Sequence, residues 1–499
     1  MSGLLASLLM IAGCSVTPVY EKPAAAVPTA FKSAPLPVQE AGTWKTAQPA
    51  EAVARGDWWT VFGDSTLNDL EAQARDANQN LKAAAARLEQ ARALQRTARS
   101  ALFPTLDAGF GPTRERVSPA SLGLSPGANV AQTTLWRAQA SASYEVDLFG
   151  RVSASVQAAQ ADTQRSEALL RSVLLAVQAD VAQNYFNLRE LDAEADVFAR
   201  TVAGRENALR LMQRRYAEGD IGELDVARAR SELATARADS ITVARSRAAS
   251  EDSLAVLLGK SPSEFKMTPQ PLTSVAVQIP AGLPSALLER RPDIAAAERE
   301  MAAANARVGV AKSAFFPSLS LTGAGGFEAG TLGNLFQWSS RTFLLGPLVG
   351  TALSLPIFDG GARRGNLANA RAQYEEDVAT YRQQVLVAFQ EVEDHLSDLQ
   401  LLNTQLAAQN DAVQASSRAA QLSRLQYKEG QTSYLDVIEA ERTVFETQRV
   451  AAQLTGAQAV STVNLIRALG GGWGNSPAVS SNEPAAAAGS SRDAVVAAK

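Results

Sequence analysis

The chain has 499 residues, a formal net charge of −4, one Cys and one His. This slightly acidic balance, without blocks of Lys or Arg, argues against nucleic acid as a partner. So few Cys and His residues leave almost no material for a metal site, a disulfide framework or a catalytic triad, so neither a cofactor nor an enzyme is expected.

A lipoprotein leader is predicted at the start of the chain. The apolar run from Leu4 to Ile11 is followed by two small residues and then Cys14, a pattern typical of a bacterial lipoprotein cleavage site. Residues 1–13 would be the signal peptide and Cys14 the lipid-modified first residue, although no Lys or Arg precedes the apolar run. The alternative is a buried free Cys. Residues 14–56 are rich in Pro and Ala and are expected to be extended, without a core of their own.

A first folded unit is expected at residues 57–260. It opens with a Trp-Trp-x-x-Phe-Gly-Asp motif, and apolar residues at helical spacing predict a helix from Leu67 to Ala91. Residues 105–110 and 136–148 alternate polar and apolar side chains, which predicts two strands with a different environment on each face. Since no apolar run reaches the ~18–20 residues of a membrane-spanning helix, such strands would have to make any membrane crossing.

Two long helices complete this first unit. A regular apolar stripe predicts a helix from about Gly150 to Tyr216, which would be on the order of 100 Å long at about 1.5 Å per residue. A return helix is expected from about Leu224 to Leu258, and residues 261–284 link the two halves of the chain.

The second unit, at residues 285–472, is expected to repeat the first. A helix begins at Arg291, and strands are predicted at 318–327 and 348–357. A long helix with a heptad rhythm and a second return helix follow. The Ser- and Ala-rich residues 473–499 are expected to be a disordered tail.

The turns between the long helices carry almost the same motif. Tyr, Gly, Leu and Asp recur at one constant separation: Tyr216, Gly219, Leu224 and Asp225 in the first turn, Tyr427, Gly430, Leu435 and Asp436 in the second. Gly tolerates the left-handed conformation that ends a helix, and an acidic residue suits the start of the next helix. Each copy therefore predicts the tip of a long antiparallel helical hairpin, and the chain is interpreted as duplicated.

Four strands per chain are too few to close a membrane barrel. The smallest such barrels need about eight strands, and open sheet edges are not tolerated in lipid. The strands must therefore be pooled between copies of the chain, so that two copies would give eight strands and three would give twelve. Long helices that leave from the same end would continue the wall as a helical tube.

At this point the motifs carry a family resemblance. The lipobox, the Trp-Trp motif, the paired Phe-Pro-x-Leu strand starts, the Leu-Pro-Ile-Phe-Asp-Gly-Gly segment and the two tips resemble the TolC-type outer-membrane factors. Over residues 57–472 and Cys14 the chain is most similar to their lipoprotein branch, the NodT/OprM-like efflux channels. The resemblance implies a mixed α and β fold: a homotrimer with a twelve-stranded outer-membrane β-barrel, four strands per chain, continued by a long periplasmic α-helical coiled-coil barrel.

The same resemblance implies a function and partners. Such lipid-anchored channels are the exit ducts of tripartite pumps, in which a periplasmic adaptor (membrane fusion) protein and an inner-membrane transporter of the RND type deliver small molecules such as drugs. Alternatives within the family are type I secretion and metal-ion efflux. Outside it, a coiled-coil periplasmic interaction protein would explain the heptads but not the strands. A lipoprotein enzyme that acts on the cell wall is the other alternative, but the sequence has no paired acids, no nucleophile with a base and no metal cluster at workable spacing.

The resemblance also predicts a periplasmic gate and a latch. In the family, carboxylates just past the tip Leu form rings at the channel entrance, and the corresponding residues are Asp436 and Glu439, beside Leu435. A threefold ring would concentrate negative charge and retain cations; the alternative is a solvated acidic first turn of a helix.

The latch is predicted at Asp225 and Tyr427, which match an Asp and a Tyr that hold neighbouring coils together in closed TolC-like channels. The Arg that reinforces this latch in some members is replaced here by Thr432.

Two further features have modest interpretations. His395 lies on the polar face of a coiled helix and is expected to be solvated rather than to bind a metal ion. Four aromatic residues are candidates for the membrane interfaces, with subunit packing as the alternative: Trp136, Tyr144, Trp338 and Phe343.

Overall fold

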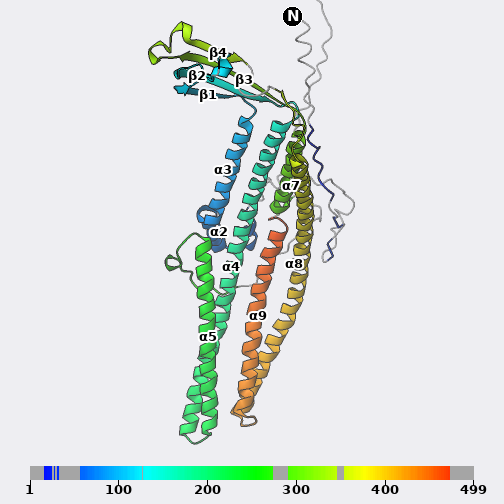
Figure 1. Cartoon of the computed structure of the whole chain (residues 1–499). Helices are drawn as coiled ribbons and strands as arrows, with labels where there is room; N and C mark the ends of the chain where they lie inside the picture. Colours follow the sequence, from blue (N-terminus) through cyan, green and yellow to red (C-terminus); the bar gives the residue numbers. More distant parts are fainter. Residues whose placement is uncertain are drawn as a thin grey trace, which may run out of the picture.

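The computed structural model describes residues 16–24, 27–28, 31–32, 57–125, 127–272, 290–345 and 353–471. The molecule is elongated, with a small antiparallel sheet at one end and a bundle of long helices extending away from it (Figure 1). Within the described ranges, none of the helices combines the length and the apolar character that a membrane-spanning helix requires.

Helix lengths repeat between the two halves of the chain. The matched pairs are α3 (Gln79–Ser100) and α7 (Pro292–Ser313) with 22 residues each, α4 (Arg151–Ala217) and α8 (Ala362–Lys428) with 67 each, and α5 (Glu223–Leu257) and α9 (Tyr434–Ala468) with 35 each. This agreement confirms the predicted duplication. α4 with α5 and α8 with α9 form two long antiparallel hairpins whose tips lie far from the sheet (Figure 1).

The prediction of one continuous helix from Leu67 to Ala91 is wrong. The chain instead forms α2 (Ser65–Ala77) and α3, separated by Asn78, whose backbone is extended. The Asn78 Oδ1 atom accepts a hydrogen bond of 3.1 Å from the Leu81 N–H, and its Nδ2 atom donates one of 2.8 Å to the Leu257 carbonyl. Asn is a favourable N-cap, and the Leu257 carbonyl accepts the hydrogen bond from the side-chain NH₂ group of Asn78.

The Trp-Trp motif builds a core around the middle of the long helices. Trp58 and Trp59, in the short 3₁₀ turn η1 (Trp58–Phe62), are buried in a cluster that includes residues of α2, α4, α5 and α9. Asp64 then caps α2, because its Oδ1 atom accepts hydrogen bonds from the N–H groups of Thr66 (2.8 Å) and Leu67 (3.2 Å). Its Oδ2 atom accepts from the Tyr185 hydroxyl of α4, so the motif both starts a helix and attaches it to the hairpin.

The sheet joins the two repeats. Its strands are β1 (Thr105–Glu115), β2 (Thr133–Val146), β3 (Ser318–Ala329), β4 (Arg341–Leu345) and β5 (Leu353–Ser354). The order is β1-β2-β3-β4, every pairing is antiparallel, and β5 also pairs with β3. At the junction of the repeats, a Cβ atom on Gly326 would lie 2.1 Å from the Ala138 carbonyl oxygen. Only Gly permits the backbones of β2 and β3 to approach so closely.

Several strand boundaries differ from the predictions: β1 ends at Glu115 and not at 110, β2 spans Thr133–Val146 and not 136–148, and β3 ends at Ala329 and not at 327. The fourth strand was predicted at 348–357, but β4 begins at Arg341, and only the short β5 falls inside the predicted range; residues 346–352 lie outside the described residues. β2 ends at Val146 because the Asp147 carboxylate accepts hydrogen bonds from the N–H groups of Val152 (3.0 Å) and Ser153 (2.7 Å). Asp147 therefore belongs to the start of α4 and not to the strand.

The predicted interface aromatics occupy different parts of the sheet end. Trp136 of β2 packs against Phe110 of β1, with 6.0 Å between ring centroids. Trp338, in η5 (Trp338–Ser340), and Phe343 of β4 are exposed, while Tyr144 is half-buried. Exposed aromatic rings suit a lipid boundary, and their position at the membrane interfaces stays a prediction.

The described residues before Asp57 pack against both repeats. The Val16 N–H donates to the Phe149 carbonyl at 3.5 Å, next to the start of α4, and the Asn305 side chain of α7 donates to the Pro18 carbonyl at 2.9 Å. Further along, Phe31 is buried in a cluster with residues of α7, α8 and α9. Cys14 itself lies outside the described residues.

Candidate functional site at the paired hairpin tips

The two tips have the same backbone hydrogen-bond pattern. Gly219 and Gly430 adopt left-handed φ angles of 79° and 71°. Each glycine N–H donates to the carbonyl three residues earlier, of Tyr216 in one tip and Tyr427 in the other. Since a residue with a side chain is strained at such φ angles, the repeated Gly accounts for the repeated turn.

A shared hydrophobic cluster packs the two tips against each other. Its buried members are Met212 and Ala229 from the first hairpin and Tyr434, Val437 and Ile438 from the second. The hairpins of one chain therefore form a single packed unit near their tips.

Tyr427 makes a polar contact across this boundary. The Arg215 Nη1 atom of α4 donates a hydrogen bond of 2.9 Å to the Tyr427 hydroxyl, and its guanidinium carbon lies 5.3 Å from the centre of the ring. Burial raises the pKa of Tyr427, the charge of Arg215 lowers it, and the carboxylate of Asp225 raises it. Tyr427 and Asp225 are thus close enough for their charges to interact, but the Tyr427 hydroxyl is bonded to Arg215.

Arg215 was missed by the sequence reasoning. It precedes Tyr216 by one residue, in the last turn of α4, and a basic residue is favourable at the end of any helix. Its contact with Tyr427 joins residues 212 positions apart, and nothing in the local sequence indicates that pairing. The predicted Asp225–Tyr427 latch itself stays a prediction; the structure pairs Asp225 with Arg228 at 3.6 Å.

The counterparts in the first tip are differently placed. Tyr216 and Leu224 are 47% and 61% exposed, whereas Tyr427 is half-buried and Leu435 is 38% exposed. The duplicated motif thus forms two similar turns with unequal surroundings, and the second tip is the one whose Tyr is packed against its neighbour.

Asp436 has a well-defined local role. Its Oδ2 atom accepts hydrogen bonds from the Ser433 N–H (2.9 Å), the Ser433 hydroxyl (2.7 Å) and the Thr432 hydroxyl (2.5 Å). The Ser433 hydroxyl in turn accepts from the Asp436 N–H, which completes a capping box at the start of α9. These bonds, that from Thr432 first, lower the pKa of Asp436, so this carboxylate is ionised at neutral pH.

This geometry also gives Thr432 a function. At the position where some members of the resembling family carry an Arg, the Thr432 hydroxyl is a hydrogen-bond donor to Asp436. Glu439, one turn further along α9, is exposed. The predicted gate residues Leu435, Asp436 and Glu439 therefore lie on the exposed first turns of α9, and the ring that they would form across several chains stays a prediction.

His395 lies on α8 away from the tips. Its ring is half-buried, and its Nδ1 atom has no hydrogen-bond partner among the described residues. Burial lowers the pKa of His395, against the opposing charges of Asp398, Glu391 and Asp394, which makes it a neutral ring at pH 7. Within the described parts of the chain, no group of three or more His, Cys, Asp or Glu side chains is arranged to hold a metal ion.

The comparisons with known proteins agree with this architecture. The model of the family "Outer membrane efflux protein" matches residues 70–260 and 283–471, which are the two repeats. The toluene efflux pump outer membrane protein TtgF of Pseudomonas putida is 35% identical over 476 residues, which cover 94% of this chain and 96% of TtgF. The cation efflux system protein CusC of Escherichia coli is 31% identical over 469 residues, 93% of this chain and 97% of CusC.

A solved structure shows the same fold. The outer-membrane channel OprN superimposes with a TM-score of 0.82 and 29% sequence identity, over 92% of this chain and all (100%) of the OprN chain.

Proposed function

Since this chain belongs to the outer membrane efflux protein family, we propose that three copies of it form one exit duct for toxic small molecules. The chain is an outer-membrane channel component of an efflux pump, with helices that extend into the periplasm, and it is not an enzyme.

The two open edges of the sheet are the observation that supports a trimer. Among the described residues, β1 pairs only with β2, and β4 pairs only with β3, so the sheet has two free edges. Lipid does not tolerate free edges, and the edge of one copy can pair with the opposite edge of the next. Since β4 and β5 pair with successive stretches of the same edge of β3, they count as one strand, and each copy contributes four. Two copies would make eight strands, whose interior is just filled by side chains. Three would make twelve, which leaves room for a lumen.

The length and the tips of the hairpins support a role within a larger pump. Helices of 67 residues reach on the order of 100 Å from the sheet, and their tips present exposed Tyr216, Leu224 and Leu435 side chains. Such a surface suits a periplasmic adaptor (membrane fusion) protein, which would in turn join the channel to an inner-membrane RND transporter.

For the cargo, we propose small organic molecules, as the name of TtgF states for that relative. Metal-ion efflux is the second candidate. The likeness to CusC and the exposed carboxylates Asp436 and Glu439 at the tip favour it, because acidic rings select cations. A strain that lacks its own outer-membrane efflux channel and is complemented with this chain separates the two. Restored tolerance to toluene or antibiotics supports the first, and restored tolerance to toxic metal cations supports the second.

The assembly is tested by the mass of the detergent-extracted protein and by its conductance in planar bilayers. We expect a heat-modifiable trimer that conducts ions. Gly326→Ala should abolish it, because the added methyl group would overlap the Ala138 carbonyl oxygen, whereas Gly325→Ala is a matched control whose Cβ atom lies 4.0 Å from its nearest neighbour. A monomeric, non-conducting wild type would refute the proposal.

A further inference from the structure

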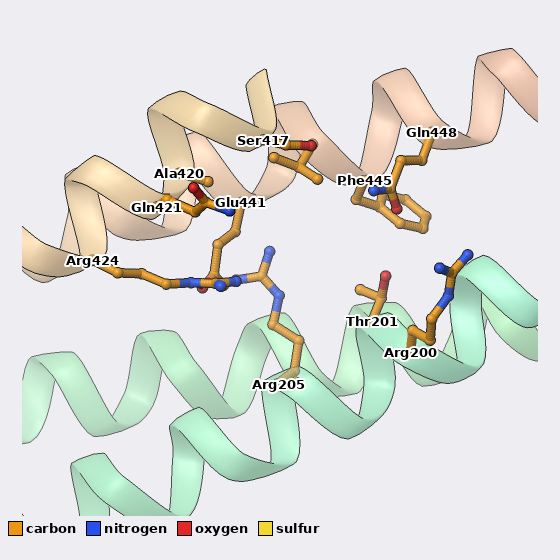
Figure 2. A pocket seen from close by; sticks show the side chains of 12 residues that line it. Arg200, Thr201, Arg205, Ser417, Ala420, Gln421, Arg424, Glu441, Phe445 and Gln448 are labelled. Carbon is orange, nitrogen blue, oxygen red and sulfur yellow. The ribbon is translucent and has the colours of Figure 1, made fainter. Parts of the chain in front are cut away.

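A cavity between the two hairpins is not used by the channel function described above. Its volume is about 310 Å³, and it is bounded by α4 on one side and by α8 and α9 on the other (Figure 2). The lining residues that matter here are Arg200, Gly204, Arg205, Arg424, Glu441 and Phe445. Since one water molecule takes up about 30 Å³ in the liquid, the cavity holds a small solute together with several waters.

Arg205 is the most unusual of these residues. Its side chain is only 5% exposed, and it rises from α4 toward the facing helices (Figure 2). The Nη1 atom lies 3.2 Å from a Glu441 oxygen, yet it makes no hydrogen bond with any described residue. A buried guanidinium N–H without an acceptor is unfavourable, so a polar cavity at this position calls for a ligand with acceptor oxygens.

The neighbouring carboxylates are already engaged by other cations. Glu441 receives a hydrogen bond of 2.7 Å from the Arg424 Nε atom of α8. Glu232 of α5, 3.5 Å from Arg205, is held by both nitrogens of the Arg442 guanidinium. Three Arg side chains therefore share these two carboxylates, and Glu439 also acts electrostatically on Arg442.

Gly204 leaves the mouth of the cavity open. It lies inside α4, where Gly is less favourable than Ala by about 1 kcal/mol. A Cβ atom at this position would meet nothing within 4 Å. The space next to Arg205 is therefore accessible. Arg200, 65% exposed and one helical turn before Gly204, lies at the rim, where its guanidinium group pairs with Asp196 at 3.1 Å (Figure 2).

We propose that this cavity binds a small oxyanion, a phosphate or a carboxylate group of a periplasmic solute. Arg205 supplies the buried donor, Arg424 supplies charge from the opposite wall, and Arg200, paired with Asp196, supplies further N–H donors at the rim. Guanidinium groups match the geometry of such oxyanions. Because Arg205 belongs to α4 and Arg424 to α8, the bound anion joins the two hairpins of the chain.

Inorganic phosphate is the probe, and the detergent-extracted full chain is the sample. Isothermal titration calorimetry at constant ionic strength, with chloride in the control titration, should give saturable binding of one phosphate per chain. Gly204→Met, which places a long side chain in the cavity without replacing Arg205, should abolish it. Gly204→Ala is the matched control and should bind like the wild type.

A second pair of variants keeps the test decisive if Gly204→Met fails to fold. Arg200→Gln should weaken phosphate binding by about tenfold, the effect of one charge-assisted hydrogen bond. Arg210→Gln, on an exposed position of α4 outside the cavity, should have no effect. Absence of saturable binding by the wild type overturns the proposal, and so does equal binding by the wild type and Gly204→Met or Arg200→Gln.

Discussion

Glu71 gives the most quantitative test of how the folded body is packed. Its side chain lies on the buried face of α2, is 1% exposed, and has no hydrogen-bond partner for either oxygen among the described residues. Burial, reinforced by the charge of Asp57 and opposed by that of Arg75, raises the pKa of Glu71 to about 9. At pH 7 the native protein therefore contains a neutral carboxylic acid at this position.

The sign of the pH dependence follows from proton linkage. In the unfolded chain Glu71 ionises near its ordinary pKa of 4.5, so between this pH and about pH 9 the native state binds the extra proton. The contribution of Glu71 to the free energy of unfolding is therefore most favourable below pH 4.5, and it is lost as the pH rises toward 9. At about 1.4 kcal/mol per pH unit, the loss between pH 4.5 and pH 7 is about 3 kcal/mol per chain.

Glu71→Gln removes the ionisation and keeps a neutral polar group of the same shape. We expect it to match the wild type near pH 4.5 and to be more stable by about 3 kcal/mol at pH 7. For a chain of this length, 1 kcal/mol corresponds to about 1 °C in the unfolding midpoint, so the midpoint at pH 7 should rise by about 3 °C.

Circular dichroism melts in detergent at a single scan rate measure this difference. Asp69→Asn, at an exposed position of the same helix, is the control and should leave the midpoint unchanged at both pH values. Equal midpoints for the wild type and Glu71→Gln at pH 7 would show that Glu71 is ionised and paired in the assembled protein, and would refute the reasoning.

Three further predictions concern the ends of the molecule. Cys14→Ser should abolish labelling by fatty acids while trimers still assemble, and a wild type that takes up no label would contradict the lipobox. Tyr427→Phe with Asp225→Ala should raise single-channel conductance, because one lost hydrogen bond of about 1 kcal/mol shifts a closed–open equilibrium about fivefold; unchanged conductance would make these residues ordinary packing. Asp436→Asn with Glu439→Gln should weaken cation selectivity in planar bilayers, and unaltered selectivity would exclude the ring.

The long hairpins could be predicted from sequence because their signals are local and repeated. A helical stripe sustained over many turns, ended by Gly219 or Gly430, has few alternative structures. Asn78 shows the limit of this reasoning: it breaks the expected helix because the Leu257 carbonyl receives its amide, and that partner is invisible in the local sequence. The fourth strand begins earlier than predicted for a related reason, since Arg341 to Leu345 are held as a strand by their pairing with β3, which no local pattern shows.

The site was predictable in position and not in its contacts. The duplicated motif located both tips, and the family resemblance predicted the gate at the second of them. Which side chains meet depends on how α4 and α5 pack against α8 and α9, and no local pattern specifies that packing. The Arg215–Tyr427 hydrogen bond could be established only from the three-dimensional arrangement, whereas the spacing of Ser433 and Asp436 is a local signal of a capping box.

Because the two tips are packed unequally, a motion that separates the hairpins must break a specific set of contacts. Tyr434 and Tyr427 of the second hairpin contact the cluster around Met212 of the first, whereas Tyr216, the counterpart of Tyr427, is exposed. A motion that separates the hairpins must withdraw both packed rings from apolar contact and also break the Arg215–Tyr427 bond and the Arg205–Glu441 ion pair. The apolar contacts resist it at any ionic strength, while salt screens the more exposed charges. Salt alone should therefore loosen the tips without opening them.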